Sequence, residues 1–384
     1  MKILVTGGSG FIGSNFISRS LQKSDKIKII NLDALLTGSN HKNLPKMDSK
    51  RYNFVKGNIC NKTLVSKLIK KVDCVVNFAA ESHVDRSIVN SKNFVNSNIL
   101  GVHTILEELR NNKNVKMIQI STDEVFGDID KGSFYENDVL NPSNPYSATK
   151  AAAEMLVKSY VRTYDLDVTI TRCVNNYGPR QFPEKLIPKI ILSSLQGLPI
   201  PIHGDGKSRR QWIHVFDHCD AIFKIMKKSK KSSPIYNIPG NFESSNLDLV
   251  KKILKIMDKS DDLIKFVSDR PGQDKRYAIK SRKIKKELNF EPKIKFNDGI
   301  FSTINWYLEN KYLDKYLLDS QKMVDTVSQK GIILYLLNFL LTSRINSSSY
   351  FISDLDLHLC ISRKRLSLTK DSPTIQDFLG VNFL

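Results

Sequence analysis

Five side chains in the middle of this sequence combine two kinds of chemistry. Thr122, Asp123 and Glu124 end a predicted strand, and Tyr146 and Lys150 stand four residues apart in a predicted helix. Residues at this spacing share one helix face, so the phenol and the ammonium group can point at one substrate. The cation is predicted to lower the pKa of Tyr146 from its ordinary value of about 10. Such a tyrosine base accompanies hydride transfer, and two adjacent carboxyl groups beside it indicate elimination of water. The alternative interpretation of Asp123 and Glu124 is a solvated turn at the end of the strand.

A glycine motif near the N-terminus predicts the site of a redox cofactor. Gly7, Gly10 and Gly13 follow an apolar strand, and Phe11 and Ile12 begin the next helix. Glycines allow a tight turn and a close approach to a pyrophosphate, and the helix N-terminus offers amide donors and a partial positive charge. The motif therefore predicts a dinucleotide cradle.

An acidic residue after the second strand indicates which dinucleotide binds. Asp33 follows the glycines by about twenty positions, as expected for a ribose-binding carboxylate. A carboxylate at this place accepts hydrogen bonds from a ribose diol and repels a 2′-phosphate, which favours NAD over NADP. Asn58 and Ile59 follow the third predicted strand and are predicted to hold the edge and face of the adenine. A simple turn is the alternative for Asn58.

Apolar runs alternate with helix-length segments through the first half of the chain. This alternation predicts right-handed β-α-β crossovers, and hence an α/β fold with a Rossmann-type doubly wound parallel sheet. We assign residues 1–172 to this NAD-binding domain, with some later segments returning to it. The predicted strands are Lys2–Thr6, Ile27–Leu32, Cys74–Phe78, Lys116–Ser121 and Val168–Arg172.

A smaller mixed α/β substrate-binding domain is predicted for residues 173–316, where turns rich in proline and glycine replace the regular alternation. Its predicted elements are the strands Ile200–Gly204 and Ile235–Ile238 and the helices Leu247–Met257 and Gly299–Leu308. Residues 317–384 form a C-terminal extension of unknown role. Its apolar stretch, Gly331–Leu341, is shorter than the ~20 residues of a membrane span, so a buried or partner-facing helix is predicted.

The composition narrows the class of protein. A chain of 384 residues with 41% apolar and 26% charged residues is typical of a folded globular protein. The net charge of +20 comes from lysines spread along the chain without a basic stripe, which favours a phosphorylated small molecule over nucleic acid. Five scattered cysteines predict neither a zinc site nor a disulfide framework. The N-terminus lacks the features of a signal peptide, and we expect a cytoplasmic protein.

Six stretches of the chain resemble one enzyme family. They are TGGSGFIGSNF, NFAAESHVDRSI, STDEVFGD, NPYSATKAAAE, TRCVNNYGPRQFPEKLIP and RPGQDKRYAI. Together they are similar to the motifs of the extended short-chain dehydrogenase/reductases and, among them, of the dTDP-glucose 4,6-dehydratase family. The resemblance implies that Thr122, Tyr146 and Lys150 serve the oxidation at C4 of the sugar, that Asp123 is the acid and that Glu124 is the base. It also implies a tightly bound NAD, regenerated in each turnover of a hydro-lyase that makes a 4-keto-6-deoxy sugar.

The same resemblance assigns binding residues. Ala79 and Ala80 contact the cofactor together with Tyr146 and Lys150, and no metal is implied. The substrate-binding residues are Ser82, His83, Thr122, Asn175, Lys185, Leu186, Arg210 and Arg270. The arginines suit a diphosphate because a guanidinium fork matches phosphate geometry. A homodimer is implied, through the helices that follow Asn93 and Tyr146.

Departures from the family pattern leave alternatives open. Gln273 stands where a histidine is usual, and Asn58 stands where an aspartate is usual. We expect dTDP as the nucleotide, and UDP is the alternative because this choice depends on contacts around the base. A nucleotide-sugar epimerase or decarboxylase shares the NAD site and the Tyr/Lys pair but normally lacks the Asp-Glu pair. A non-enzymatic scaffold for RNA or protein is a further class, and the intact catalytic side chains weigh against it.

Overall fold

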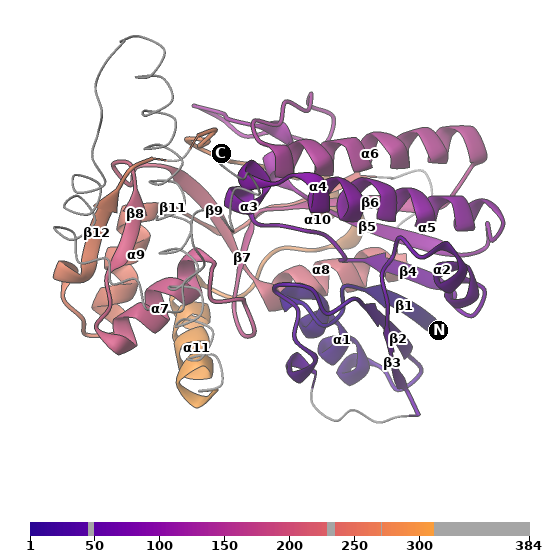
Figure 1. Cartoon of the computed structure of the whole chain (residues 1–384), viewed down its shortest axis with the longest axis horizontal. Coiled ribbons are helices and arrows are strands. Elements are labelled where there is room, and N and C mark those ends of the chain that lie inside the picture. Colours follow the sequence, from indigo (N-terminus) through magenta and orange to yellow (C-terminus); the bar gives the residue numbers. More distant parts are fainter. Residues whose placement is uncertain (45–49, 229–234, 270, 311–384) are drawn as a thin grey trace, which may run out of the picture. The chain divides into compact units, whose positions relative to one another are not determined.

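The computed structural model describes residues 1–44, 50–228, 235–269 and 271–310. Its largest element is a seven-stranded sheet with the order β10-β6-β5-β4-β1-β2-β3, in which all neighbouring strands are parallel (Figure 1). The strands are β1 (Lys2–Thr6), β2 (Lys28–Asp33), β3 (Tyr52–Lys56), β4 (Cys74–Asn77), β5 (Lys116–Thr122), β6 (Val168–Cys173) and β10 (Ile235–Ile238). The predicted α/β class with a doubly wound parallel sheet is confirmed.

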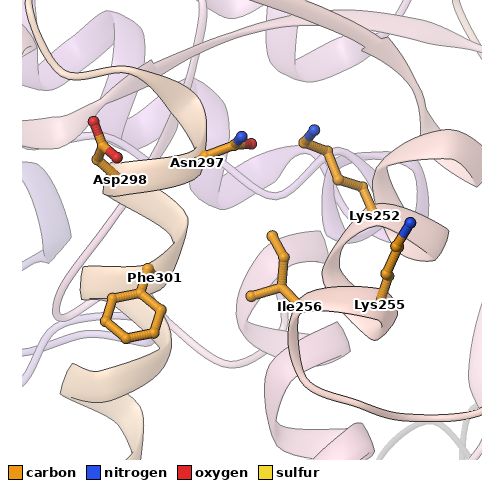
Figure 2. Close-up of a pocket in the computed structure, with 6 residues that line it drawn as sticks. All are labelled: Lys252, Lys255, Ile256, Asn297, Asp298 and Phe301. Carbon is orange, nitrogen blue, oxygen red and sulfur yellow. The ribbon is translucent and has the colours of Figure 1, made fainter.

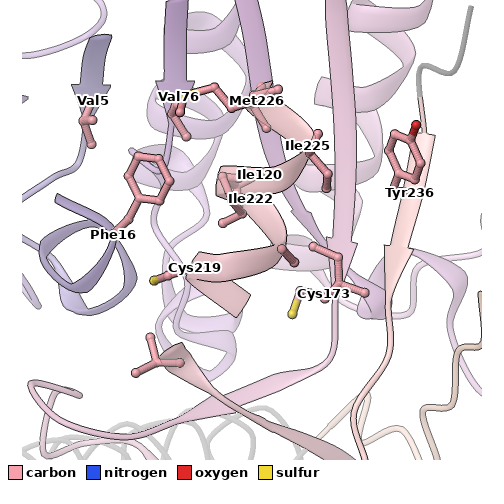
Figure 3. Packing of buried hydrophobic residues seen from close by; sticks show 14 of the residues in the cluster. Val5, Phe16, Val76, Ile120, Cys173, Cys219, Ile222, Ile225, Met226 and Tyr236 are labelled. Carbon is pink, nitrogen blue, oxygen red and sulfur yellow. The ribbon is translucent and has the colours of Figure 1, made fainter. Parts of the chain in front are cut away.

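Both faces of this sheet are covered, and the central strands β4 and β6 are therefore buried along their whole length. Val5 of β1 lies in a core with Phe16 and Ile222, as Figure 3 shows, whereas Leu4 next to it lies in a second core. The first core contains side chains of α1 (Phe11–Lys23) and α8 (Val215–Lys228), and the second contains side chains of α2 (Lys62–Ile69), α5 (Gly101–Arg110) and α6 (Pro145–Tyr164). Between α2 and α5 lie α3 (Val84–Val89), α4 (Lys92–Phe94) and the π-helix η2 (Val95–Leu100), and the short 3-10 helix η1 (His41–Asn43) follows β2.

One predicted strand belongs to a different sheet from the one expected. Ile235–Ile238 was predicted for the smaller domain, but as β10 it pairs in parallel with β6, with Ile235 opposite Ile170. That prediction is wrong because a short run of apolar residues shows that a strand is buried and does not show which strand lies beside it. Helix α8, which precedes β10, packs on α1 of the same domain.

The remaining strands form two small sheets. One has the order β11-β9-β7, from β7 (Asn175–Tyr177), β9 (Arg209–His214) and β11 (Phe242–Ser245), and the other pairs β8 (Ile200–His203) with β12 (Ile264–Val267). A third core joins them to α7 (Leu186–Gln196), α9 (Asn246–Ile256) and α11 (Phe296–Glu309). The 3-10 helices η3 (Asp123–Phe126) and η4 (Asp261–Leu263) and helix α10 (Lys283–Leu288) complete the described elements. The predicted strand at residues 200–204 and both predicted helices are confirmed, whereas the domain boundaries stay predictions.

A pocket of about 720 Å³ opens between α9 and α11 (Figure 2). It is lined by Lys252, Lys255, Ile256, Asn297, Asp298 and Phe301, none of which belongs to the predicted site. The predicted helix in the apolar stretch Gly331–Leu341 lies outside the described residues. Within the part of the chain that the structure describes, no helix is long and apolar enough to cross a membrane.

Candidate active site

Three consecutive residues at the end of β5 place the two carboxyl groups. Thr122 is the last residue of the strand and caps η3, because its Oγ1 accepts a hydrogen bond of 3.3 Å from the backbone N–H of Glu124. The same hydroxyl lies 3.2 Å from Oδ1 of Asp123. The turn of η3 therefore directs Asp123 inward, where it is 2% exposed.

The environment of Asp123 favours its protonated form. Burial raises the pKa of this carboxyl to about 8, and the charge of Glu124 adds to the effect, whereas the hydrogen bond with Thr122 and the charge of Arg210 oppose it. Oδ2 of Asp123 is buried and has no hydrogen-bond partner among the described residues. A buried, protonated carboxyl group with one oxygen uncommitted can donate a proton to a substrate.

Helix α6 carries Tyr146 and Lys150 from a well-defined start. Asn144 is its N-cap, and Asn144 and Ser147 bond each other's backbone in a capping box. Pro145 occupies the first turn, where its fixed backbone angle suits a helix. Tyr146 and Lys150 are 8% and 6% exposed, so the predicted helix start and the shared face of the pair are confirmed.

The prediction for the pKa of Tyr146 is wrong in sign. Burial of the phenol raises its pKa, Glu124 and Asp123 raise it further, and the hydrogen bond with Thr122 acts in the opposite direction. Lys150 instead donates a hydrogen bond of 2.6 Å to the carbonyl oxygen of Ile120. Burial lowers the pKa of Lys150 to about 8. Loss of hydration and two neighbouring carboxyl groups thus outweigh the cation expected from the sequence.

The glycine motif forms a cradle that side chains would fill. Gly7 adopts a positive φ of 66°, and a Cβ there would lie 2.6 Å from the backbone nitrogen of Ala79. A Cβ on Gly13 would lie 2.4 Å from the carbonyl oxygen of Gly7. Gly10 is the N-cap of α1 and brings no side chain to its first turn. This close backbone approach at a helix start, which contains Phe11 and Ile12, fits a dinucleotide pyrophosphate.

Asp33 lies beside this cradle at the end of β2. Its carboxylate is 4% exposed and accepts hydrogen bonds from the backbone of Ser9 and Leu35 and from the hydroxyl of Ser39, at 2.8–2.9 Å. These bonds hold the carboxylate in place and use three of its approximately four acceptor positions. The arrangement therefore fits a carboxylate that also receives a ribose hydroxyl.

The residues predicted for the adenine make local contacts. The side-chain oxygen of Asn58 accepts a hydrogen bond of 2.8 Å from the backbone of Cys60, and Ile59 is 5% exposed in the core that includes α5. Asn58 thus makes the turn given as its alternative, and a role at the adenine stays a prediction for both residues. Ala79 and Ala80 follow β4, next to the Gly7 turn and half-buried.

The residues predicted to bind the sugar lie on two segments that touch. Nζ of Lys185 donates a hydrogen bond of 2.8 Å to the carbonyl oxygen of Ser82, directly before α7 begins at Leu186. His83 lies 3.9 Å from Glu184, whose carboxylate accepts a bond of 2.5 Å from Arg86. The structure therefore brings the segment after β4 together with the start of α7.

Arg210 of β9 reaches the carboxyl pair. Its guanidinium lies 4.2 Å from the centre of the Tyr277 ring and donates a bond of 2.8 Å to the backbone oxygen of Asp274. Its charge acts on Asp123, so a predicted phosphate ligand lies near the predicted acid. Asn175 begins β7, which pairs with β9. Arg270 lies outside the described residues.

Sequence reasoning missed several residues that hold these groups. Asp274 accepts hydrogen bonds from Tyr277 and, at 2.5 Å, from Ser143, which stands immediately before the N-cap of α6. Asn98 of η2 donates to the carbonyl of Glu81 and to the hydroxyl of Thr149. Asp274 lies within the RPGQDKRYAI stretch, so its motif could have indicated a role at the site. No motif indicated Asn98, because its partners are distant in sequence.

Known proteins are similar to this chain over the region that contains the predicted site residues. The family model of GDP-mannose 4,6 dehydratase matches residues 4–303. A dTDP-glucose 4,6-dehydratase of Streptomyces niveus is 42% identical over 316 residues, which cover 81% of this chain and 94% of that protein. The low-salt glycan biosynthesis protein Agl12 of Haloferax volcanii is 46% identical over 309 residues, covering 80% and 99%. The crystal structure of DesIV, a dTDP-glucose 4,6-dehydratase of Streptomyces venezuelae with NAD and dTDP bound, is 40% identical with a TM-score of 0.79, covering 81% and 98%.

Proposed function

We propose that this chain, which belongs to the GDP-mannose 4,6-dehydratase family, is an NAD-dependent dTDP-glucose 4,6-dehydratase, a hydro-lyase. The observation that carries the proposal is the grouping of a buried tyrosine, a threonine hydroxyl and two adjacent carboxyl groups at the end of β5. Tyr146 is close enough to Glu124 and Asp123 for both to act on its pKa, and it hydrogen-bonds Thr122. An epimerase or a decarboxylase has no comparable use for a protonated carboxyl group beside the base.

Each side chain has its own task in this reaction. NAD held by the glycine cradle and Asp33 would supply the hydride acceptor for C4 of the sugar and the hydride donor for C6. Tyr146 accepts the proton of the C4 hydroxyl, and Thr122 orients that oxygen. Glu124 removes the proton at C5, which the C4 ketone has made acidic, while Asp123 donates a proton to the departing C6 hydroxyl. When C6 receives the hydride, Glu124 returns a proton to C5. Lys150 presents its positive charge on the same face of α6 as Tyr146 and contacts the cofactor together with it.

In this proposal, different residues bind the cofactor and the nucleotide sugar. The glycine cradle holds the pyrophosphate of the cofactor, and Asp33 holds its ribose, which excludes a 2′-phosphate. Ser82, His83, Asn175 and the Lys185-Leu186 pair contact the nucleotide sugar, and Arg210 and Arg270 contact its diphosphate. The buried positions of Asp33 and Arg210 support these roles.

The identity of the product tests the function. Incubation with dTDP-glucose is expected to give a nucleotide sugar that is lighter by one water molecule, as measured by mass spectrometry. UDP-glucose in a parallel incubation tests the nucleotide, because Gln273, which donates a bond of 3.2 Å to Ser208, stands where the family usually has a histidine. Preferential dehydration of UDP-glucose would replace dTDP by UDP in the proposal, and an isomer of unchanged mass would reject dehydration.

We further propose that two copies of the chain form a homodimer in the cytoplasm. Large apolar side chains are exposed on the helices after Asn93 and on α6, with exposed fractions of 50% for Leu100, 47% for Met155 and 39% for Val95. Several large exposed apolar side chains on neighbouring helices support an interface at this place. The described cysteines are all free thiols, which suits a reducing compartment.

Light scattering tests the dimer. The wild-type protein at micromolar concentration is expected to have twice the 43.8 kDa mass of one chain. Leu100→Glu places a charge in the apolar surface and is expected to shift the protein toward the monomer. Val139→Glu is the matched control, because Val139 is 82% exposed and lies outside those helices. A monomeric wild type, or equal dissociation by both variants, would contradict the proposal.

A further inference from the structure

A fully buried ion pair lies one helical turn beyond Lys150. The side chains of Glu154 and Arg172 are both 0% exposed, and Nη2 of the arginine lies 2.7 Å from Oε2 of the glutamate. Nε of Arg172 contacts both carboxylate oxygens at 3.1 Å, and Nη1 donates a bond of 2.9 Å to the carbonyl of Glu136. The guanidinium also lies 4.6 Å from the centre of the Phe126 ring. Each of the three guanidinium nitrogens therefore has a hydrogen-bond partner.

The position of the pair connects it to the catalytic helix. Tyr146, Lys150 and Glu154 follow one another at intervals of four residues, so they lie along one face of α6. Arg172 is on β6, opposite Ser121 of β5, one residue from the carbonyl of Ile120 that holds Lys150. The pair and the ammonium group of Lys150 thus both lie where α6 packs against β5 and β6.

Stability alone gives no reason for charges at this place. Removing two charges from water costs free energy that their attraction often fails to return, and apolar residues of similar volume are frequently as stable. A carboxylate beside a buried ammonium group stabilises that cation, because the opposite charge offsets the loss of hydration.

We propose that Glu154 is a positioning residue that keeps Lys150 in its ammonium form, and that Arg172 holds the Glu154 carboxylate in its orientation. The inference rests on the proposed function for the role of Lys150 in the reaction. Burial lowers the pKa of Lys150 to about 8, and the charge of Glu154 is what opposes this shift. Arg172 acts instead on Lys158, whose pKa burial and this arginine lower. Without Glu154, Lys150 would lose its proton at a lower pH.

Other charged groups also lie on α6 and on the elements that pack against it. Asp123 and Glu124 of η3 act on Tyr146. Arg86 of α3 is bonded to Glu184, and Glu107 of α5 is bonded to Arg110 and Tyr160. The remaining charged residues on these elements are Asp85 of α3, Lys92 of α4, Glu108 of α5, Lys116 of β5 and, on α6 itself, Arg162. Among the described residues, Glu154 is the one whose charge acts on Lys150.

Nuclear magnetic resonance of protein labelled with ¹³C at the lysine Cε measures the pKa of Lys150 directly, with Lys150→Met to assign its signal. Glu154→Gln is expected to lower this pKa by about one unit, the size expected for loss of a nearby opposite charge. The double variant Glu154→Leu/Arg172→Met removes the pair without leaving an unpaired charge. It is expected to unfold close to the wild-type denaturant midpoint and still to show the lowered pKa of Lys150.

Two results would overturn the inference, and a third variant serves as a control. An unchanged pKa of Lys150 in the double variant overturns the inference, since a purely structural pair would give that result. If the double variant does not fold, an unchanged pKa in Glu154→Gln overturns it equally. The control Arg19→Met/Asp220→Asn removes a pair on α1 and α8 whose side chains are 26% and 29% exposed, and it is expected to leave the pKa unchanged.

The dependence of kcat on pH separates this inference from the proposed function. If Lys150 must be protonated, a lower pKa moves the loss of activity to lower pH, so the alkaline limb of the double variant is expected to shift down by the same amount as the pKa. A wild type that makes no dehydrated product rejects the proposed function and leaves the resonance result standing. A wild type that dehydrates, combined with variants whose Lys150 signal does not move, rejects the inference alone.

Discussion

Replacement of Tyr146 by phenylalanine is expected to lower kcat for dehydration of dTDP-glucose about a thousandfold, within the range of general-base contributions. This corresponds to about 4 kcal/mol of transition-state stabilisation. Phenylalanine cannot accept the proton of the C4 hydroxyl. The ring itself is retained, and its edge contact with Phe94, at 6.3 Å between ring centres, supports the same fold. Formation of the keto sugar at saturating substrate measures the effect.

Tyr236→Phe is the matched control for this experiment. Tyr236 is 0% exposed, and its hydroxyl donates a hydrogen bond of 2.6 Å to Glu287, so this variant also removes one buried phenolic hydroxyl. We expect a loss of about 1 kcal/mol in the free energy of unfolding and an unchanged kcat. If Tyr146→Phe keeps more than a tenth of the wild-type kcat while it is folded, another group is the base.

Glu124→Gln is expected to lower kcat at least a hundredfold, because the amide cannot remove the proton at C5. Oxidation at C4 does not require this carboxylate and remains possible. In deuterated water the wild type is expected to place solvent deuterium at C5 of the product, and the variant is expected to leave the C5 hydrogen of recovered dTDP-glucose unchanged. Mass spectrometry of both sugars measures this difference.

Glu287→Gln provides the comparison for this change of carboxylate to amide. Glu287 accepts the Tyr236 hydroxyl and takes no part in the proposed site, so its substitution is expected to leave kcat and deuterium incorporation unchanged. Dehydration by Glu124→Gln at the wild-type rate would show that the base is misassigned. Deuterium at C5 without dehydration would instead show that the slow step is proton donation by Asp123 to the C6 hydroxyl.

Much of the Rossmann domain could be predicted from the sequence because its strands are buried on both faces. The strand Lys2–Thr6 has the predicted bounds, and the other predicted strands of the domain differ by one residue at their ends. The family inferred from six motifs is confirmed by the comparisons, since the motifs span the region that the family model matches. Catalytic roles stay predictions, although Tyr146, Thr122 and the carboxyl pair lie together.

Other features depend on contacts that a single sequence does not reveal. The pKa of Tyr146 is governed by how deeply the phenol is buried and by two carboxyl groups from another element. Arg210 was predicted for the diphosphate from its motif alone, but its orientation is set by Tyr277 and by the backbone of Asp274, more than sixty residues later. The i,i+4 spacing predicted that Lys150 shares a face with Tyr146 and did not show that Ile120 holds its ammonium group.

The place of β10 beside β6 has a consequence for the synthesis of the protein. After Cys173 the chain leaves the seven-stranded sheet and forms β7, β8 and β9, which belong to the two small sheets. It returns to the seven-stranded sheet only with α8 and Ile235–Ile238. A nascent chain therefore exposes the edge of β6 until at least residue 238 has emerged from the ribosome, and the side of α1 that packs on α8 until α8 has emerged. The seven-stranded sheet therefore cannot be completed before Ile238 is synthesised, and residues 1–173 alone do not contain all of its strands.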